Sequence, residues 1–254
     1  MKKIDFCFTI VCSENYILET IGLIKNINRI YPRRKIFIVS LDYQTVKIIK
    51  KYNLKCQTIS VKEIWGVDFY RNLASRMSTP EIAYASKSAA ASYILKNFSK
   101  SLLILDADLL ILKKIDDIID FTKKYAVTVV SANRNLQDWK RTNKIGLFSA
   151  GIIGFSSDSL FGVEWWKEQC FANTNVNIFL GCYNEQKYLD YLLSNYETKI
   201  IRDYGINVSS TFLKRAKPYF NSNKRSWFSE DGKLIRIFHQ SRVTDHPIYK
   251  KKLE

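Results

Sequence analysis

The stretch "LLILDADLLIL", Leu102 to Leu112, decides the fold of this chain. Nine of its eleven residues are apolar, as is typical of a strand that is buried on both faces of a sheet. Asp106 and Asp108 nevertheless stand in its middle. A buried carboxylate is costly unless it is paired, hydrogen-bonded or bound to a cation. The stretch therefore predicts a core strand whose end carries a functional site that contains two carboxylates.

Strand and helix patterns alternate through the first half of the chain. Besides the central stretch, strand patterns cover residues 4–11, 35–42, 56–61 and 126–132. Helix patterns cover residues 17–27, 44–53, 81–98 and 115–125, and the third of these follows Thr79-Pro80 in the manner of a capped helix. This alternation predicts an α/β fold with a mainly parallel twisted sheet that is flanked by helices.

The second half is less regular. "GLFSAGIIGF" (146–155) predicts a strand, 159–171 and 184–196 predict helices, and "LIRIFHQS" (234–241) predicts a late strand. The polar and basic residues 214–233 predict a loop that could close over a ligand. No internal repeat and no Gly/Ser-rich or Pro-rich linker divides the sequence, so we expect residues 1–254 to form one domain.

Composition narrows the class of protein. The chain has 254 residues, 46% of them hydrophobic, and no apolar run as long as a membrane span. Its beginning, with an acid at Asp5, is read as a first strand and not as a signal peptide. Five scattered cysteines without a CxxC pair argue against a disulfide framework or a structural zinc site and favour a reducing, cytoplasmic compartment.

The formal net charge is +16. Such a surplus suits nucleic acid, an anionic membrane surface or a phosphate-rich substrate. It could equally reflect a composition that is rich in lysine. No signature of an RNA-binding module accompanies the charge, so no nucleic-acid partner is expected.

The two aspartates predict a metal site. In an extended strand, side chains two residues apart point to the same face, and open α/β sheets bind ligands beyond the carboxyl ends of their strands. Hard oxygen ligands there suit magnesium or manganese that carries a substrate's phosphates. Phosphatases of the haloacid dehalogenase type also have a DxD, but their DxDx(T/V) pattern near the N-terminus is not matched, since Leu110 takes the last position.

Six segments, in order, resemble those of GT-A fold, DxD-containing glycosyltransferases, especially the glycogenin-like and bacterial surface-sugar enzymes. The segments are "TIVCSENYILETIGLIKNI" (9–27), "YASKSAAASYIL" (84–95), the DxD strand with "SAGIIGF" (149–155), "NEQKYLDYL" (184–192), "GINVSSTFL" (205–213) and "IRIFHQS" (235–241). The resemblance spans nearly the whole chain. It implies a nucleotide-binding half (1–132) and an acceptor-side half (133–254) with a basic tail.

The resemblance also implies roles for single residues. Tyr16 would stack on the nucleotide base, and Lys87 would contact the donor's phosphates or sugar. The nucleotide-binding residues would be Ile10, Cys12, Asn15, Tyr16, Lys87 and Asp106. The metal, Mn²⁺ or Mg²⁺, would be held by Asp106, Asp108 and His239, and an imidazole ligand favours manganese. The other histidine, His246, is assigned to the tail.

Catalytic residues and sugar contacts follow from the same resemblance. Glu185 and Gln186 would be catalytic, although the family's DQ is EQ here. Ser149, Gly151 and Asn207 would contact sugar or acceptor, with Ser149 in place of the asparagine that is common in the family.

The implied reaction moves a sugar from a nucleoside-diphosphate sugar, with uridine as the expected base, to a hydroxyl acceptor. Retention of configuration is favoured, whereas an inverting enzyme would use Glu185 as base. A glycan or lipid-linked acceptor of a surface polysaccharide would suit a basic cytoplasmic enzyme at the inner membrane face. Two alternatives stay open. One is a sugar nucleotidyltransferase, although the Gly-rich start is missing, and the other is a non-catalytic basic binding protein.

Overall fold

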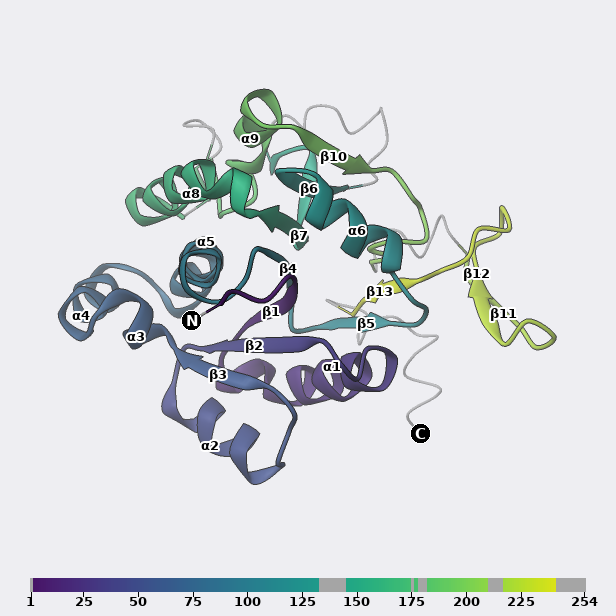
Figure 1. Ribbon diagram of the computed structural model, residues 1–254, viewed down its shortest axis with the longest axis horizontal. Coiled ribbons are helices and arrows are strands. Elements are labelled where there is room, and N and C mark those ends of the chain that lie inside the picture. Colours follow the sequence, from purple (N-terminus) through teal and green to yellow (C-terminus); the bar gives the residue numbers. More distant parts are fainter. Residues whose placement is uncertain (1, 133–144, 175, 178–181, 210–216, 241–254) are drawn as a thin grey trace.

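The structure, a computed structural model, describes residues 2–132, 145–174, 176–177, 182–209 and 217–240. Its centre is a sheet of seven strands in the order β10-β6-β7-β4-β1-β2-β3 (Figure 1). These strands are β1 (Cys7–Cys12), β2 (Lys35–Ser40), β3 (Gln57–Ser60), β4 (Ser101–Leu105), β6 (Val127–Ser131), β7 (Phe148–Ser156) and β10 (Thr198–Ile201).

Only β7 runs against its neighbours in this sheet. It pairs antiparallel with β4 and β6, whereas the other neighbouring strands pair in parallel. The predicted mainly parallel α/β sheet is therefore confirmed. Because β1 and β4 are adjacent and parallel, with Ile10 opposite Leu105, the loops that follow both strands leave the sheet at the same edge.

Short strands form three small ribbons beside this sheet. β5 (Leu109–Ile111) pairs with β13 (Ile237–His239), β8 (Val176–Asn177) with β9 (Cys182–Tyr183), and β11 (Tyr219–Asn221) with β12 (Ser226–Phe228). The first of these ribbons brings the C-terminal part of the described chain next to the residues that follow β4.

Helices cover both faces of the sheet (Figure 1). They are α1 (Ile17–Ile30), α2 (Tyr43–Lys51), α3 (Val61–Trp65), α4 (Val67–Arg76), α5 (Thr79–Asn97), α6 (Asp116–Lys124), α8 (Leu160–Ala172) and α9 (Leu189–Asn195), with short 3₁₀ turns at Glu14–Tyr16 and Ser157–Ser159. Among the described residues, no helix has both the length and the apolar character that a membrane span needs.

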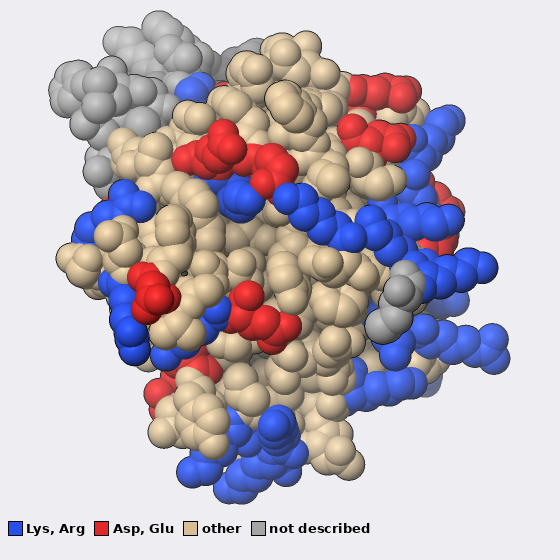
Figure 2. All heavy atoms as spheres, turned by 60° about the vertical axis from the view of Figure 1, so that its left-hand side comes forward, with Lys and Arg blue, Asp and Glu red and all other residues tan. Residues whose placement is uncertain are grey.

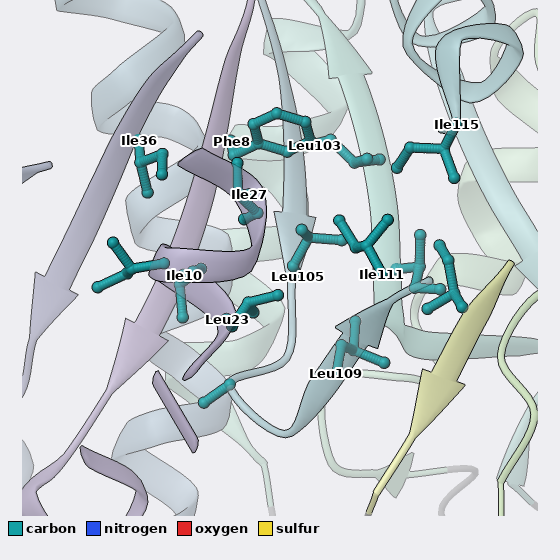
Figure 3. Packing of buried hydrophobic residues seen from close by; sticks show 14 of the residues in the cluster. Phe8, Ile10, Leu23, Ile27, Ile36, Leu103, Leu105, Leu109, Ile111 and Ile115 are labelled. Atoms are coloured by element: carbon teal, nitrogen blue, oxygen red, sulfur yellow. The ribbon is translucent and has the colours of Figure 1, made fainter. Parts of the chain in front are cut away.

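Side chains of β4 alternate between two cores. Leu103 and Leu105 join Phe8 and Ile10 against α1 and α6 (Figure 3), whereas Leu102 and Ile104 face the side covered by α5 and α8. All four β4 leucine and isoleucine side chains are fully buried. A strand that is covered on both faces explains the uninterrupted apolar run in the sequence.

Helix α5 starts as its sequence predicts. Ser78 and Glu81 form a capping box, and Pro80 lies in the first turn. Small residues such as Ala85, Ala89 and Ala90 are buried along this helix, which lets it pass between the sheet and α8. The helix carries Lys87 into the protein interior at its midpoint.

Four local predictions differ from the structure. The central stretch is not one strand, because the chain turns at Ala107–Asp108 between β4 and β5. The helix expected over 184–196 begins only at Leu189. Part of the loop expected over 214–233 is the hairpin β11–β12. Helices α3 and α4 were not predicted, since residues 61–76 lack a long apolar period.

Glu164 connects α8 to α5. Its carboxylate accepts hydrogen bonds from Ser92 and Lys167, and lies 2.8 Å from the Lys96 ammonium. Burial alone would raise the pKa of Glu164, but these three partners outweigh it and lower the pKa to about 2.

Changing Glu164 to Gln is expected to lower the free energy of unfolding at pH 7 by about 1–2 kcal/mol. The full linkage value of about 3 kcal/mol is reduced because the side chain is partly solvated. Since the folded pKa is depressed, this stabilisation is complete above the unfolded pKa and disappears as pH falls toward 2. Urea unfolding of both proteins at pH 7 and pH 3 measures it.

Glu168→Gln is the matched control, because Glu168 is an exposed residue of the same helix with no ion pair among the described residues. Its free energy of unfolding should change by less than about 0.5 kcal/mol. Equal losses in the two variants would contradict the assignment.

Candidate functional site

The site begins where β4 ends. The Asp106 backbone N–H donates to Gly151 of β7 (2.9 Å), and the Leu109 N–H donates back to the Asp106 carbonyl (3.3 Å), which closes a tight turn. The Asp108 carbonyl accepts from the Gln240 N–H at 2.8 Å. The backbone thus fixes both aspartates between the main sheet and the β5–β13 ribbon, although the strand does not stay extended through them.

Asp106, Asp108 and His239 converge. One ligand atom from each lies within 4.8 Å of the others. His239 Nε2 is 3.1 Å from Asp108 Oδ1 and 3.7 Å from Asp106 Oδ2. Two carboxylates and an imidazole at this spacing fit a divalent cation such as Mn²⁺ or Mg²⁺. The three residues expected as metal ligands are therefore brought together.

The charge of His239 depends on the same carboxylates. Burial would lower the pKa of His239, but the hydrogen bond to Asp108 and the charges of Asp106 and Asp108 outweigh burial and raise it. A histidine binds a metal only as the neutral imidazole, so a cation here would replace the proton that the carboxylates otherwise favour.

Asn207 orients the imidazole. Its Oδ1 lies 2.7 Å from His239 Nδ1. With the amide in this orientation, Nδ1 carries a proton, so the proton that a metal would displace is the one on Nε2, which faces the carboxylates. Asn207 has φ 62°, in the left-handed region that asparagine tolerates better than most residues. Its expected contact with sugar or acceptor stays a prediction.

Gly151 is needed for close packing. A Cβ at this position would lie 2.9 Å from His239 Cε1 and 3.0 Å from Asp106 Oδ2, distances too short for carbon. The Gly151 N–H also donates to the Ser149 hydroxyl at 3.2 Å. Ser149 and Gly151 thus lie on β7 directly beside the metal-ligand candidates.

Lys87 lies behind the metal-ligand candidates. Its Nζ is 2.6 Å from Asp106 Oδ1, 2.6 Å from Glu185 Oε1 and 3.4 Å from the Ala150 carbonyl. Burial would lower the pKa of Lys87, but the two carboxylates outweigh it and raise the pKa, so the ammonium stays charged. Together with Asp108, the cluster has three carboxylates and one lysine, and the net negative charge that remains favours a cation.

Glu185 and Gln186 precede α9 and do not lie within it. Glu185 is 2% exposed, and its carbonyl accepts from the Trp166 indole N–H at 3.0 Å. Gln186 donates to the Ile145 carbonyl at 2.6 Å and accepts from the Ala150 N–H at 3.4 Å. Glu185 is therefore held against Lys87, and Gln186 against β7, while their catalytic role stays a prediction.

The residues at the end of β1 lie next to the end of β4, because the two strands are adjacent and parallel. The side chains of Ile10 and Cys12 are buried, whereas Asn15 is exposed and Tyr16 is 52% exposed. Burial raises the pKa of the Cys12 thiol to about 12, so it is a neutral group that accepts from Thr20. Ile10 is 0% and Cys12 2% exposed, backbone included, so of these residues only Asn15 and Tyr16 offer exposed surface to a ligand.

Tyr84 was missed by the sequence reasoning. It stands one turn before Lys87 on α5 and is half-buried. Burial, followed by the charge of Glu185, raises the pKa of Tyr84, and Tyr16 and Asp106 are close enough to contribute. Its position i−3 to Lys87 was the available signal. His246 and the basic tail lie outside the described residues.

Comparisons with known proteins identify the fold. No family model matches the chain. The uncharacterised protein YfnF of Bacillus subtilis (strain 168) is 18% identical over 236 residues, which are 89% of this chain and 75% of YfnF.

Solved structures superpose over nearly the whole chain. The galactosyltransferase LgtC, solved with donor and acceptor sugar analogues, has a TM-score of 0.63 at 12% identity and covers 91% of this chain and 86% of its own. Mouse xyloside xylosyltransferase 1 has a TM-score of 0.58 at 10% identity, with 93% and 97% covered. A glycosyltransferase involved in glycosylation of the PBCV-1 major capsid gives 0.54 at 12%, with 92% and 93% covered. The chain has the GT-A fold that these glycosyltransferases share.

Proposed function

We propose that this protein is a metal-dependent glycosyltransferase that moves a sugar from a nucleoside-diphosphate sugar to a hydroxyl acceptor. The observation that carries the proposal is the convergence of Asp106, Asp108 and His239 at the end of β4, with Lys87 behind them. The similarity to LgtC and to the xylosyltransferase supports it. A nucleotidyltransferase or a plain binding protein has no comparable support.

The residues present fit a divalent cation with hard or borderline ligands. Asp106, Asp108 and His239 would hold it, and the imidazole favours Mn²⁺ over Mg²⁺. When bound, such an ion neutralises the charge of the donor's diphosphate and of the leaving group. Uridine is proposed as the base by resemblance, with Tyr16 stacking on it and Asn15 beside it. Cys12 and Ile10, assigned to the edge of the base by resemblance, are 2% and 0% exposed, so we propose that they support the base from beneath this surface.

Lys87 would stabilise negative charge that develops on the leaving diphosphate. Its ammonium is buried and held by Asp106 and Glu185, and a fixed charge in a site that excludes water stabilises a transition state more than a solvated one does. Ser149, Gly151 and Asn207 would border the sugar and acceptor. We also propose a catalytic role for Gln186, because LgtC has an active-site glutamine that has been changed to glutamate.

We favour retention of configuration. Glu185 would be the base of an inverting reaction, but it is 2% exposed and paired with Lys87 at 2.6 Å. A base must reach the acceptor hydroxyl directly or through one water, and this carboxylate would first have to leave its lysine. Biosynthesis of a surface glycan, a cytoplasmic location and contact with an anionic membrane remain parts of the proposal that rest on resemblance and net charge.

Asp108→Asn is expected to abolish metal-dependent nucleotide binding. For the unchanged protein, UDP at a hundred times its dissociation constant with Mn²⁺ should add about 2.7 kcal/mol of stability. The variant should lose this shift because a charged ligand is gone, and its turnover of a UDP-sugar should fall by about 100-fold or more. Thermal unfolding with Mn²⁺ or with a chelator measures the binding.

Asp68→Asn is the control for that experiment, since the Asp68 side chain on α4 is 96% exposed. It should keep the full shift. A wild-type protein that is stabilised by no nucleoside diphosphate, with or without metal, would overturn the proposed function.

Asn207→Gly is expected to weaken Mn²⁺ binding by about 10–100-fold, because it removes the partner that orients His239. Glycine keeps the left-handed backbone conformation of this residue. Asn207→Asp retains an acceptor oxygen and should stay within about threefold of the wild type. Calorimetric titration with Mn²⁺ measures both affinities, and equal affinities for Asn207→Gly and wild type would remove Asn207 from the metal site.

A further inference from the structure

We propose that the protein has a second carbohydrate site, in which an aromatic pocket among α3, α4, α5 and α8 binds one sugar ring of a neutral glycan. The pocket has a volume of about 270 Å³, and its walls include Trp65, Phe69, Phe171, Ser92, Lys96 and Lys167. It is separate from the metal-ligand cluster. Ser92 and Lys96 follow Lys87 by five and nine residues on α5, which places them roughly 8 and 14 Å farther along the helix axis.

One wall of the aromatic pocket is an apolar cluster of three rings. The rings of Trp65 and Phe69 are stacked with centroids 5.5 Å apart and planes 18° apart, and the Phe171 ring is tilted against them, by 42° to Trp65 at 3.9 Å and by 55° to Phe69 at 4.9 Å. Phe69 is 42% exposed although it is a large apolar side chain. Aromatic faces offer contact area at low cost in conformational entropy, and the C–H face of a pyranose ring is an apolar surface of matching size.

The other wall is polar. Glu164 is held there by Ser92, Lys96 and Lys167, and the Tyr93 hydroxyl donates to Glu63 at 2.9 Å. The two lysines of the pocket lining are both paired with Glu164, which is not itself a lining residue, so a free anion such as phosphate is not favoured. Sugar hydroxyl groups both donate and accept hydrogen bonds, and they suit a wall that carries the Ser92 and Tyr93 hydroxyls beside these ammonium groups.

The size of the aromatic pocket agrees with a single sugar ring. A volume of about 270 Å³ lies below the roughly 300–1,000 Å³ of sites for drug-sized ligands, so a nucleotide sugar would not be enclosed. Figure 2 brings this side of the molecule forward, and its middle shows uncharged residues with acidic and basic side chains among them.

This inference rests on the proposed function in one respect: a glycosyltransferase would have a glycan acceptor near the aromatic pocket. A growing acceptor that is held by one ring at the aromatic pocket would present its end to the metal-ligand cluster at a raised effective concentration. The binding itself needs neither nucleotide nor metal, so the two proposals can fail separately.

Saturation-transfer NMR tests the aromatic pocket directly. The probes are the methyl glycosides of glucose, galactose and N-acetylglucosamine, with a chelator present so that the metal-ligand cluster does not contribute. At least one probe should bind with a dissociation constant of about 1–10 mM. Phe69→Ala should weaken that binding about fivefold or more, the equivalent of one aromatic contact, and the ring C–H protons should receive the strongest saturation.

Phe161→Ala is the matched control, since Phe161 is an 83% exposed phenylalanine on α8 that does not line the pocket. It should bind the probes as the wild type does, and so should Asp108→Asn, whose metal-ligand cluster is disabled. Retained sugar binding in a protein that binds no nucleotide would support the aromatic pocket while removing the proposed function. Absence of binding by every probe, or equal binding by Phe69→Ala and wild type, would overturn the proposal.

Discussion

The ion pairs that Lys87 makes with Asp106 and Glu185 are the interaction on which the site depends. Each carboxylate comes from a different part of the chain, and each would be costly to bury alone. One buried ammonium at 2.6 Å from both joins α5, the end of β4 and the segment before α9. Removing one member of such a cluster leaves an uncompensated buried charge. Lys87 therefore holds Asp106 and Glu185 in place, independently of any role that it has in the reaction.

The sheet supplies the space that this cluster needs. Because β7 runs antiparallel beside β4, its carbonyl at Gly151 pairs with Asp106 and its missing side chain makes room for His239. The β5–β13 ribbon then returns the chain so that His239 reaches the turn at Asp108. Asp108 and His239, which are 131 positions apart, meet because two backbone pairings, and not side-chain affinity alone, bring them to one sheet edge.

Sequence patterns predicted the structural features that depend on neighbouring residues or on a strong apolar period. The β4 run, the capped α5 helix and the alternation of strands and helices indicated the sheet, and the resemblance supplied His239 as a third ligand. The turn within "DAD" was not predicted, because apolar residues flank it on both sides and hide the break between β4 and β5. Helices α3 and α4 lack a long apolar face. The pairing of Lys87 with Glu185 depends on tertiary contacts 98 residues apart, to which no local pattern refers.

The chain as a whole is positively charged, whereas the cluster around Lys87 is negatively charged, and both charges affect how the proposed nucleotide-sugar donor would bind. The chain as a whole carries +16, and basic side chains gather along one side of the surface in Figure 2. A positive molecule attracts an anionic nucleotide sugar over distances near the Debye length of about 8 Å and shorter. At close range the cluster has three carboxylates against Lys87 and would repel the same diphosphate. A divalent cation held by Asp106, Asp108 and His239 would cancel that negative charge, so the surface charge would promote encounter while metal occupancy decides whether the donor can stay.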